Sequence, residues 1–236
     1  MNTVRYTDPG FAKRLSALAA ASSLFDPAIE QRTRAILDDV RARGDAALLE
    51  LAERFDGARL TAEQLAATQA ELVTASLKAD ESLRAALVEA GGNIAAFARK
   101  SKRKNWQTRN SHGAVVGEKF DPFQRVGIYI PGGTAPLVST ALMTVTLAKV
   151  AGCPEIVVCT PCGKDGSINP AILFAARAAG ATEIYRVGGA QAIAAMAYGT
   201  ATIKRVQKIY GPRQRLCRRR KTARGRPRRH RLAPRP

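Results

Sequence analysis

The sequence has 236 residues, of which 46% are hydrophobic, so it is long enough to bury a core in one or two domains. It shows no signal-peptide pattern at its start, no apolar run of 18 or more residues and only four cysteines, which argues against an exported, membrane-spanning or disulfide-stapled protein and favours the cytoplasm. The formal net charge is +19, but residues 213–236 alone carry 12 Lys and Arg and no acid, so the charge does not by itself indicate a nucleic-acid-binding domain.

The N-terminal part of the chain is predicted to be mostly helical. Asp26-Pro27 is a favourable helix start, because an N-cap acceptor is followed by proline at the first helical position. Apolar residues then recur at helical spacing, and Gly44 is a predicted break. A second helical stretch is expected from about Thr61 to Lys102, interrupted near Gly91-Gly92.

The pattern changes at Trp106, after which short β-branched runs alternate with helical segments of about ten residues. The predicted strands are Val126–Ile130, Glu155–Cys159, Glu183–Val187 and Val206–Tyr210, and the predicted helices are Val138–Val150, Pro170–Ala179 and Ala190–Tyr198. This alternation predicts an α/β fold whose β-α-β-α-β unit forms a parallel sheet covered on both faces, as in Rossmann-like domains. We therefore expect an incomplete helical region at 1–122, a Rossmann-like domain at 123–212 and a disordered tail at 213–236.

Two glycine-rich turns follow predicted strands. The loop Pro131-Gly-Gly-Thr-Ala-Pro136 joins a strand to a helix, and Gly188-Gly-Ala-Gln191 repeats this arrangement after a later strand. Neither has the G-x-G-x-x-G spacing of a dinucleotide fingerprint, and each taken alone is equally well explained as a tight turn. Because the carboxyl ends of parallel strands share one edge of the sheet, the pair together predicts a ligand site there.

Other candidate chemistry is weak. Cys159-Thr-Pro-Cys162 has redox spacing, but the first cysteine ends a strand, whereas redox pairs usually begin a helix, so buried thiols are the better interpretation. The two histidines, His112 and His230, belong to no zinc-like cluster, and His112 is expected in a loop. No Ser-His-Asp set or carboxylate pair can be assigned. The spacing of residues thus predicts a nucleotide-sized site without metal ligands or catalytic residues.

Several long motifs, in order, resemble those of the histidinol dehydrogenase family over roughly residues 20–212. They are Arg43-Gly-Asp-Ala-Ala-Leu48, Glu53-Arg-Phe-Asp-Gly57, Arg125-Val-Gly-Ile-Tyr-Ile-Pro-Gly-Gly-Thr-Ala-Pro136, Ala148-Lys-Val-Ala-Gly-Cys153, Val187-Gly-Gly-Ala-Gln-Ala-Ile-Ala194 and Val206-Gln-Lys-Ile-Tyr-Gly-Pro212. Leu147, where many members have proline, is a minor departure.

The resemblance implies NAD-dependent oxidation of L-histidinol to L-histidine in homodimers, with a zinc ion that orients the substrate and a glutamate–histidine pair for proton transfer. By motif, Tyr129 and Gln191 match two residues of the family's NAD site. The third, the asparagine of a Gly-Pro-Gly-Asn motif, is lost, because the chain reads Gly211-Pro212-Arg213-Gln214. The family's zinc ligands and acid–base pair lie beyond this point, so no catalytic or metal-binding residue is assigned and the chain as written is expected to be inactive.

The tail after Pro212 has the composition of a GC-rich gene read out of frame. If its codons are read one base later, they permit Gly-Asn-Ala-Phe-Val and, further on, Ile-Asp, which is how the family continues. Gln214, Lys221 and His230 have few possible codons and therefore allow few residues in the shifted frame, and each of them is compatible with the family's continuation. We therefore predict a frameshift near the Pro212 codon. The alternative is a nucleotide-binding fragment with a selected basic arm that binds nucleic acid nonspecifically.

Overall fold

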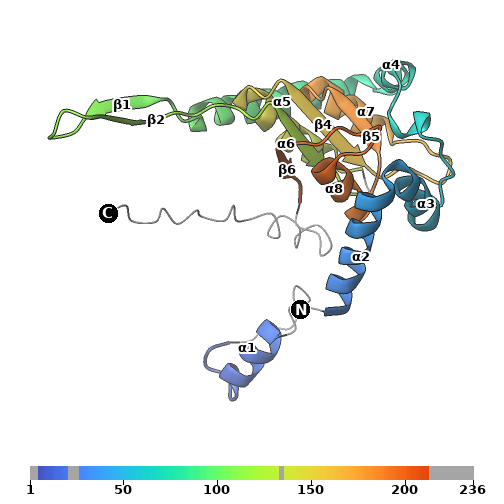
Figure 1. Ribbon diagram of the computed structural model, residues 1–236, viewed down its shortest axis with the longest axis horizontal. Coiled ribbons are helices and arrows are strands. Elements are labelled where there is room, and N and C mark those ends of the chain that lie inside the picture. The colour runs from blue at the N-terminus through green and yellow to red at the C-terminus, as the bar shows by residue number, and fades with distance from the viewer. Residues whose placement is uncertain (1–4, 21–26, 133–135, 213–236) are drawn as a thin grey trace, which may run out of the picture. The chain divides into compact units, whose positions relative to one another are not determined.

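The computed structural model describes residues 5–20, 27–132 and 136–212, so the predicted disordered tail lies outside the described residues. It divides into two compact units. In the described part of the first unit are helix α1 (Phe11–Ala20) and the beginning of α2 (Pro27–Arg43), up to residue 35. The second unit, residues 36–212, contains the sheet and all remaining described elements (Figure 1). The domain boundary predicted at 122/123 stays a prediction.

The helices that precede the sheet are α3 (Asp45–Asp56), the 3₁₀ turn η2 (Glu63–Leu65), α4 (Gln69–Lys78) and α5 (Glu81–Ser101). The predicted break at Gly44 is confirmed: its φ of 59° separates α2 from α3, a conformation that favours glycine. Thr68 begins α4 with a capping box, and the Asp80 carboxylate begins α5 by accepting from the Leu83 N–H.

The break predicted at Gly91-Gly92 is wrong, because both glycines lie inside the 21-residue helix α5. An interior glycine costs about 1 kcal/mol relative to alanine, but tertiary packing overrides this cost. At Gly91 an added Cβ would lie 3.9 Å from Leu142. At this point α5 therefore passes close to the helix that contains Leu142, Val138–Ala151.

An antiparallel hairpin of β1 (Trp106–Arg109) and β2 (Val115–Glu118) was not predicted from the sequence. All eight of its strand residues are exposed, and Figure 1 shows the hairpin extending away from the sheet of its unit. Exposed strands have no buried face to impose an apolar alternation, so the pattern was too weak to find. His112 lies in the exposed turn between the two strands.

The main sheet consists of β3 (Arg125–Tyr129), β4 (Glu155–Thr160), β5 (Glu183–Arg186) and β6 (Lys208–Tyr210). Its order is β5-β4-β3-β6, and every neighbouring pair is parallel, which confirms the predicted α/β fold. The chain adds β4 and β5 on one side of β3 and then returns to place β6 on the other side. This reversal creates a topological switch point at β3.

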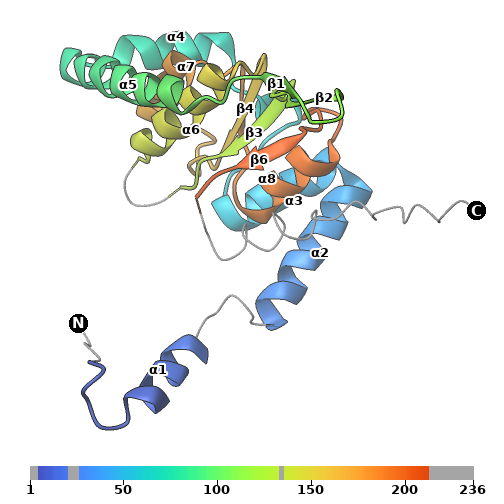
Figure 2. The same cartoon turned by 90° about the vertical axis from the view of Figure 1, so that its left-hand side faces the viewer.

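Helices cover both faces of the sheet, as predicted (Figure 2). Helices α6 (Val138–Ala151) and α7 (Pro170–Ala179) pack together on one face with α4 and α5, whereas α8 (Gly189–Tyr198) packs with α3 on the other. On the α8 face, Gly127 gives Met196 room against β3, since an added Cβ would lie 2.5 Å from the Met196 sulfur. Within the described residues no helix is both long and apolar enough to cross a bilayer.

Candidate functional site

The carboxyl ends of the four parallel strands meet at one edge of the sheet, where each strand runs into a loop that contains glycine or proline. These loops are Pro131-Gly132 after β3, Pro161-Cys162 after β4, Gly188-Gly189 after β5 and Gly211-Pro212 after β6. Residues 133–135 of the first loop lie outside the described part. In open parallel sheets, ligands bind at this edge, beside the switch point.

Pro161 brings two of these loops into contact. An added Cβ at Gly132 would lie 2.6 Å from Pro161 Cγ, and one at Gly188 would lie 2.7 Å from Pro161 Cβ. Any side chain at either position would therefore clash with the proline ring. The glycines of the two predicted turns are needed for the loops to pack closely, in addition to any role in approaching a ligand.

Tyr129 and Gln191, the two predicted cofactor-binding residues, come together at Gly189. Tyr129 ends β3 and is 3% exposed, and its hydroxyl accepts a hydrogen bond of 2.9 Å from the Gly189 N–H. Gln191 lies in the first turn of α8 and is 2% exposed, and its Oε1 lies 2.6 Å from where a Cβ of Gly189 would be. Gly189 has a φ of 59° and begins α8. Both side chains thus surround the glycine turn that follows β5.

Asp56, the last residue of α3, contributes a carboxylate to the same edge. An added Cβ on Gly188 would lie 3.4 Å from Asp56 Oδ2, an atom that is buried and has no hydrogen-bond partner among the described residues. Burial raises the pKa of this carboxyl above its ordinary value. Asp56 lies far from the glycine turns along the chain, so no sequence pattern links it to them, and only its place in the Glu53–Gly57 motif marks it.

The two cysteines of the C-x-x-C sequence have raised pKa values. Burial raises the pKa of the Cys159 thiol strongly, and that of Cys162 is raised by burial and by the nearby Asp56 charge. Cys159 is buried and Cys162 is partly buried. A raised thiol pKa lowers the fraction of reactive thiolate, which agrees with the interpretation as buried or idle thiols. Among the residues that the structure describes, no three His, Cys, Asp or Glu side chains cluster in a way that suits a metal ion. His230 lies outside the described residues.

A separate apolar groove of about 430 Å³ lies between the end of α5, the segment before β3, and α6. Phe120, Phe123, Leu147 and Tyr210 line it and are partly exposed. Neither predicted cofactor-binding residue lines this groove.

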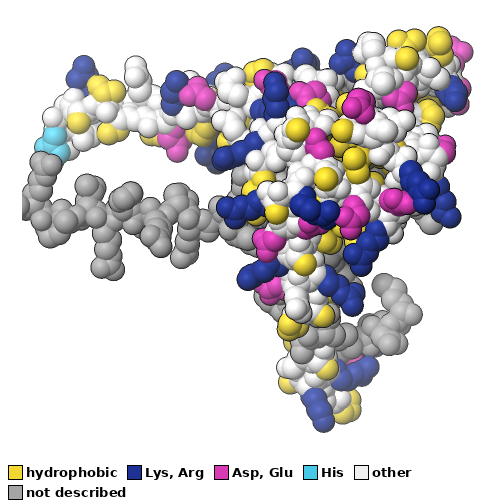
Figure 3. Space-filling model, turned by 45° about the vertical axis from the view of Figure 1, so that its right-hand side comes forward, with side chains coloured by type: hydrophobic (Ala, Val, Ile, Leu, Met, Phe, Trp, Pro, Cys, Tyr) yellow, Lys and Arg dark blue, Asp and Glu magenta, His cyan; other side chains and the backbone are white. Residues whose placement is uncertain are grey.

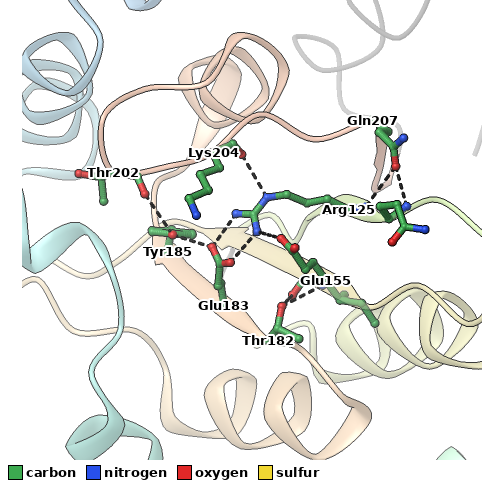
Figure 4. Close-up of polar contacts among 10 residues, drawn as sticks. Arg125, Glu155, Thr182, Glu183, Tyr185, Thr202, Lys204 and Gln207 are labelled. Atoms are coloured by element: carbon green, nitrogen blue, oxygen red, sulfur yellow. Dashed lines mark hydrogen bonds and ion pairs between the residues drawn. The ribbon is translucent and has the colours of Figure 1, made fainter.

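The opposite edge of the sheet, where the strands begin, holds an ion-pair cluster (Figure 4). Arg125 at the start of β3 donates two hydrogen bonds of 2.6 Å to Glu183 at the start of β5, and it also pairs with Glu155 at the start of β4. Tyr185 donates a hydrogen bond of 2.7 Å to the Glu183 carboxylate. Hydrogen bonding to Arg125 lowers the pKa of Glu183. The Arg125 cluster therefore ties three strands together at the edge away from the glycine turns.

Comparisons with known proteins agree on one family. The family model described as histidinol dehydrogenase matches residues 20–221. A histidinol dehydrogenase from Symbiobacterium thermophilum is 52% identical over 188 residues, and one from a Synechococcus species is 49% identical over 183 residues. These alignments cover 80% and 78% of this chain but only 43% and 42% of the two relatives.

A solved structure gives the same result. The crystal structure of a histidinol dehydrogenase from Elizabethkingia anophelis superimposes with a TM-score of 0.78 at 35% identity, over 83% of this chain and 45% of that one. The chain therefore spans less than half the length of these relatives. Since the family model covers most of its residues, the chain belongs to the histidinol dehydrogenase family.

Proposed function

We propose that this chain is the nucleotide-binding half of an enzyme that oxidises L-histidinol to L-histidine, and that NAD binds across the carboxyl edge of its sheet. The observation that carries the proposal is the meeting of Tyr129 and Gln191 at Gly189, beside the switch point of a Rossmann-like sheet. NAD, when bound, accepts a hydride. The described residues fit it in one respect: beside Gly188 the Asp56 Oδ2 atom is buried without a hydrogen-bond partner among them.

In this proposal Tyr129 contributes to the site by holding the backbone of the turn at Gly189 in place. Its hydroxyl holds the Gly189 N–H and thereby fixes the turn that begins α8. The first N–H groups of an α-helix lack acceptors within the helix, and we propose that those following Gly189 in α8 donate to an anionic or polar group of the cofactor. Gln191 supplies an amide beside this turn, which can both donate and accept.

The NAD site is tested by titrating NAD into the purified chain. We expect saturable binding, and we expect Gln191→Ala to lower the affinity about 10-fold, the loss that corresponds to one or two hydrogen bonds. Gln107→Ala is the matched control, because Gln107 lies in the exposed hairpin. Absence of NAD binding to the wild-type chain, or equal affinities for the two variants, would contradict the proposal.

We expect the zinc ligands and the acid–base pair to lie in the part of the family sequence to which this chain has no matching residues. The described residues do not fit zinc, because no cluster of ligands occurs among them. We propose that the intact enzyme is a zinc-containing homodimer of the cytoplasm, and that the 236-residue chain does not oxidise histidinol by itself. We also propose that residues 213–236 are an out-of-frame reading.

Nucleic-acid binding is the weaker alternative. On the face shown in Figure 3, Lys and Arg side chains of the described residues are interspersed with Asp and Glu, without a continuous basic surface. Any affinity for DNA would then come from the 12 cations of residues 213–236 and would fall steeply with salt.

A further inference from the structure

We propose that the apolar groove beside α6 binds a small aromatic anion, a ligand of one or two fused rings that carries a carboxylate. The inference does not rest on the proposed NAD site, because neither Tyr129 nor Gln191 lines this groove. The groove is formed by the segment after α5, the segment before β3, the second half of α6 and the end of β6.

The size and the walls of the groove suit a compact aromatic ligand. Its volume of about 430 Å³ lies in the lower part of the range of small-molecule sites, roughly 300–1,000 Å³. Three aromatic side chains line it, and Phe120, Phe123 and Tyr210 are 36%, 42% and 42% exposed. Covering these rings with another ring removes apolar surface from water and allows edge-to-face or offset stacking.

Two cations are held at the same groove. Lys102 and Arg103 both line it, and the segment Arg99–Lys104 to which they belong contains five Lys and Arg and no acid. The Lys102 ammonium group lies 3.5 Å from the carbonyl oxygen of Val150, near the end of α6. The Arg103 guanidinium lies 5.6 Å from the centroid of the Phe120 ring. Each cation is therefore positioned against a wall of the groove and still has donors for a ligand.

The one acid among the described lining residues does not cancel this charge. Asp121 forms an ion pair of 3.0 Å with Lys119, so a cation of its own accompanies it. The potential at the groove therefore favours a negative group. A carboxylate can accept charge-assisted hydrogen bonds from Lys102 and Arg103 while its ring contacts the aromatic walls.

The topology of the sheet leaves this groove accessible to a ligand. The groove lies on the face of the sheet that carries α6, whereas α8 covers the other face. A right-handed crossover from β6 to a further parallel strand at that edge would run over the α8 face. Such a continuation would not cover the groove.

The test compares two probes that share one ring system and carry opposite charges, 1-naphthoate and 1-naphthylmethylammonium. Each is titrated by calorimetry into the 236-residue chain and into the enzyme with the restored reading frame. Both proteins should bind naphthoate at least about 10-fold more tightly than the cation, the difference expected from one charge-assisted hydrogen bond. NAD should not displace naphthoate.

A pair of double variants tests the two cations. Replacing Lys102 and Arg103 by alanine should lower the affinity for naphthoate about 10-fold and leave that for the cationic probe equal or higher. All of the replaced side chains are exposed, so folding should be retained. Replacing Lys100 and Lys104 by alanine is the matched control, because it removes the same charge from the same segment without touching the groove. Naphthoate bound to the basic residues 213–236 would respond to neither double variant.

A second pair of variants tests the aromatic wall. Phe123→Ala should weaken both probes by about 5-fold or more, because both lose the same apolar contact. Phe97→Ala is its control, since Phe97 is 73% exposed on α5 and does not line the groove.

The inference is overturned if the chain binds neither probe, if it binds both equally well, or if the two double variants have the same effect. It is also overturned if the restored enzyme does not bind naphthoate, because the groove is then an internal interface of the intact protein. Displacement of naphthoate by NAD would assign the groove to the dinucleotide. If naphthoate binds as expected but the chain binds no NAD, the proposed function fails while this inference stands.

Discussion

Restoring the reading frame after the Pro212 codon is expected to turn an inactive polypeptide into a working histidinol dehydrogenase. The 236-residue chain should form no NADH from histidinol above the enzyme-free rate, since zinc ligands and the acid–base pair are expected only in the restored continuation. Removal of one base, or insertion of two, should restore Gly-Asn after Gly211-Pro212 and continue into those groups. The expected gain is on the order of 10⁶-fold, the lower end of enzymatic rate enhancements.

The measurement is NADH formation by both purified proteins, with histidinol, NAD and zinc at equal concentrations. A full-length relative such as that of Symbiobacterium thermophilum is the positive control for the assay. NADH formation by the unrepaired chain would contradict the account. So would DNA sequence downstream of codon 212 in which no frame continues coherently; the basic tail would then be a selected segment, with salt-sensitive DNA binding that is lost when residues 213–236 are deleted.

Arg125→Ala is expected to cause a large loss of stability. The Arg125 side chain is 9% exposed and pairs with Glu183 and Glu155, which are 33% and 52% exposed. Breaking a buried pair costs about 3–5 kcal/mol, and since both acids are partly solvated we expect a loss of about 2–4 kcal/mol in the free energy of unfolding at neutral pH. Urea denaturation measures it. Arg59→Ala is the control, because Arg59 pairs with Glu53 at the surface and should change stability by less than about 0.5 kcal/mol.

The pH dependence gives a second readout of the Arg125 cluster. Arg125 lowers the folded-state pKa of Glu183, so its contribution is fully present above the ordinary glutamate range and is lost as the pH falls through the lowered pKa. The difference in stability between wild type and Arg125→Ala should therefore shrink on acidification. Adding Glu183→Gln to Arg125→Ala should recover part of the loss. A difference that is constant with pH would show that Arg125 acts through packing alone.

The parts of the fold that the sequence predicted are those whose signal is local. Each sheet strand is a short apolar run between turn residues, as in Val126–Ile130, and each following helix has its own start, such as Asn169 before Pro170. Gly44 was found because one glycine with positive φ decides the local path. Gly91-Gly92 misled the prediction because the packing of α5 on α6, a tertiary effect, decides that region.

The site was predicted only in part, for the same reason. Tyr129 and Gln191 were marked by their motifs and their places at strand ends. Their meeting at Gly189, however, depends on the tyrosine side chain reaching the turn after β5, two strands away in the sheet. Asp56 and Arg125 are marked only by their places in motifs, and no local pattern indicates what they contact. Their roles arise because separate segments, such as α3 and the turn before α8, are brought together only in the folded chain.

The most direct test of the central claim is to map NAD binding on the isotopically labelled chain by NMR. We expect NAD to shift the backbone amide signals of residues 129–132, 161–163 and 188–191, together with that of Asp56, and we expect these shifts to share one saturation curve. Signals from the apolar groove around Phe120 and Phe123 should not move. Saturable shifts confined to that groove, or no shifts at the carboxyl edge of the sheet, would contradict the assignment of this edge as the NAD site.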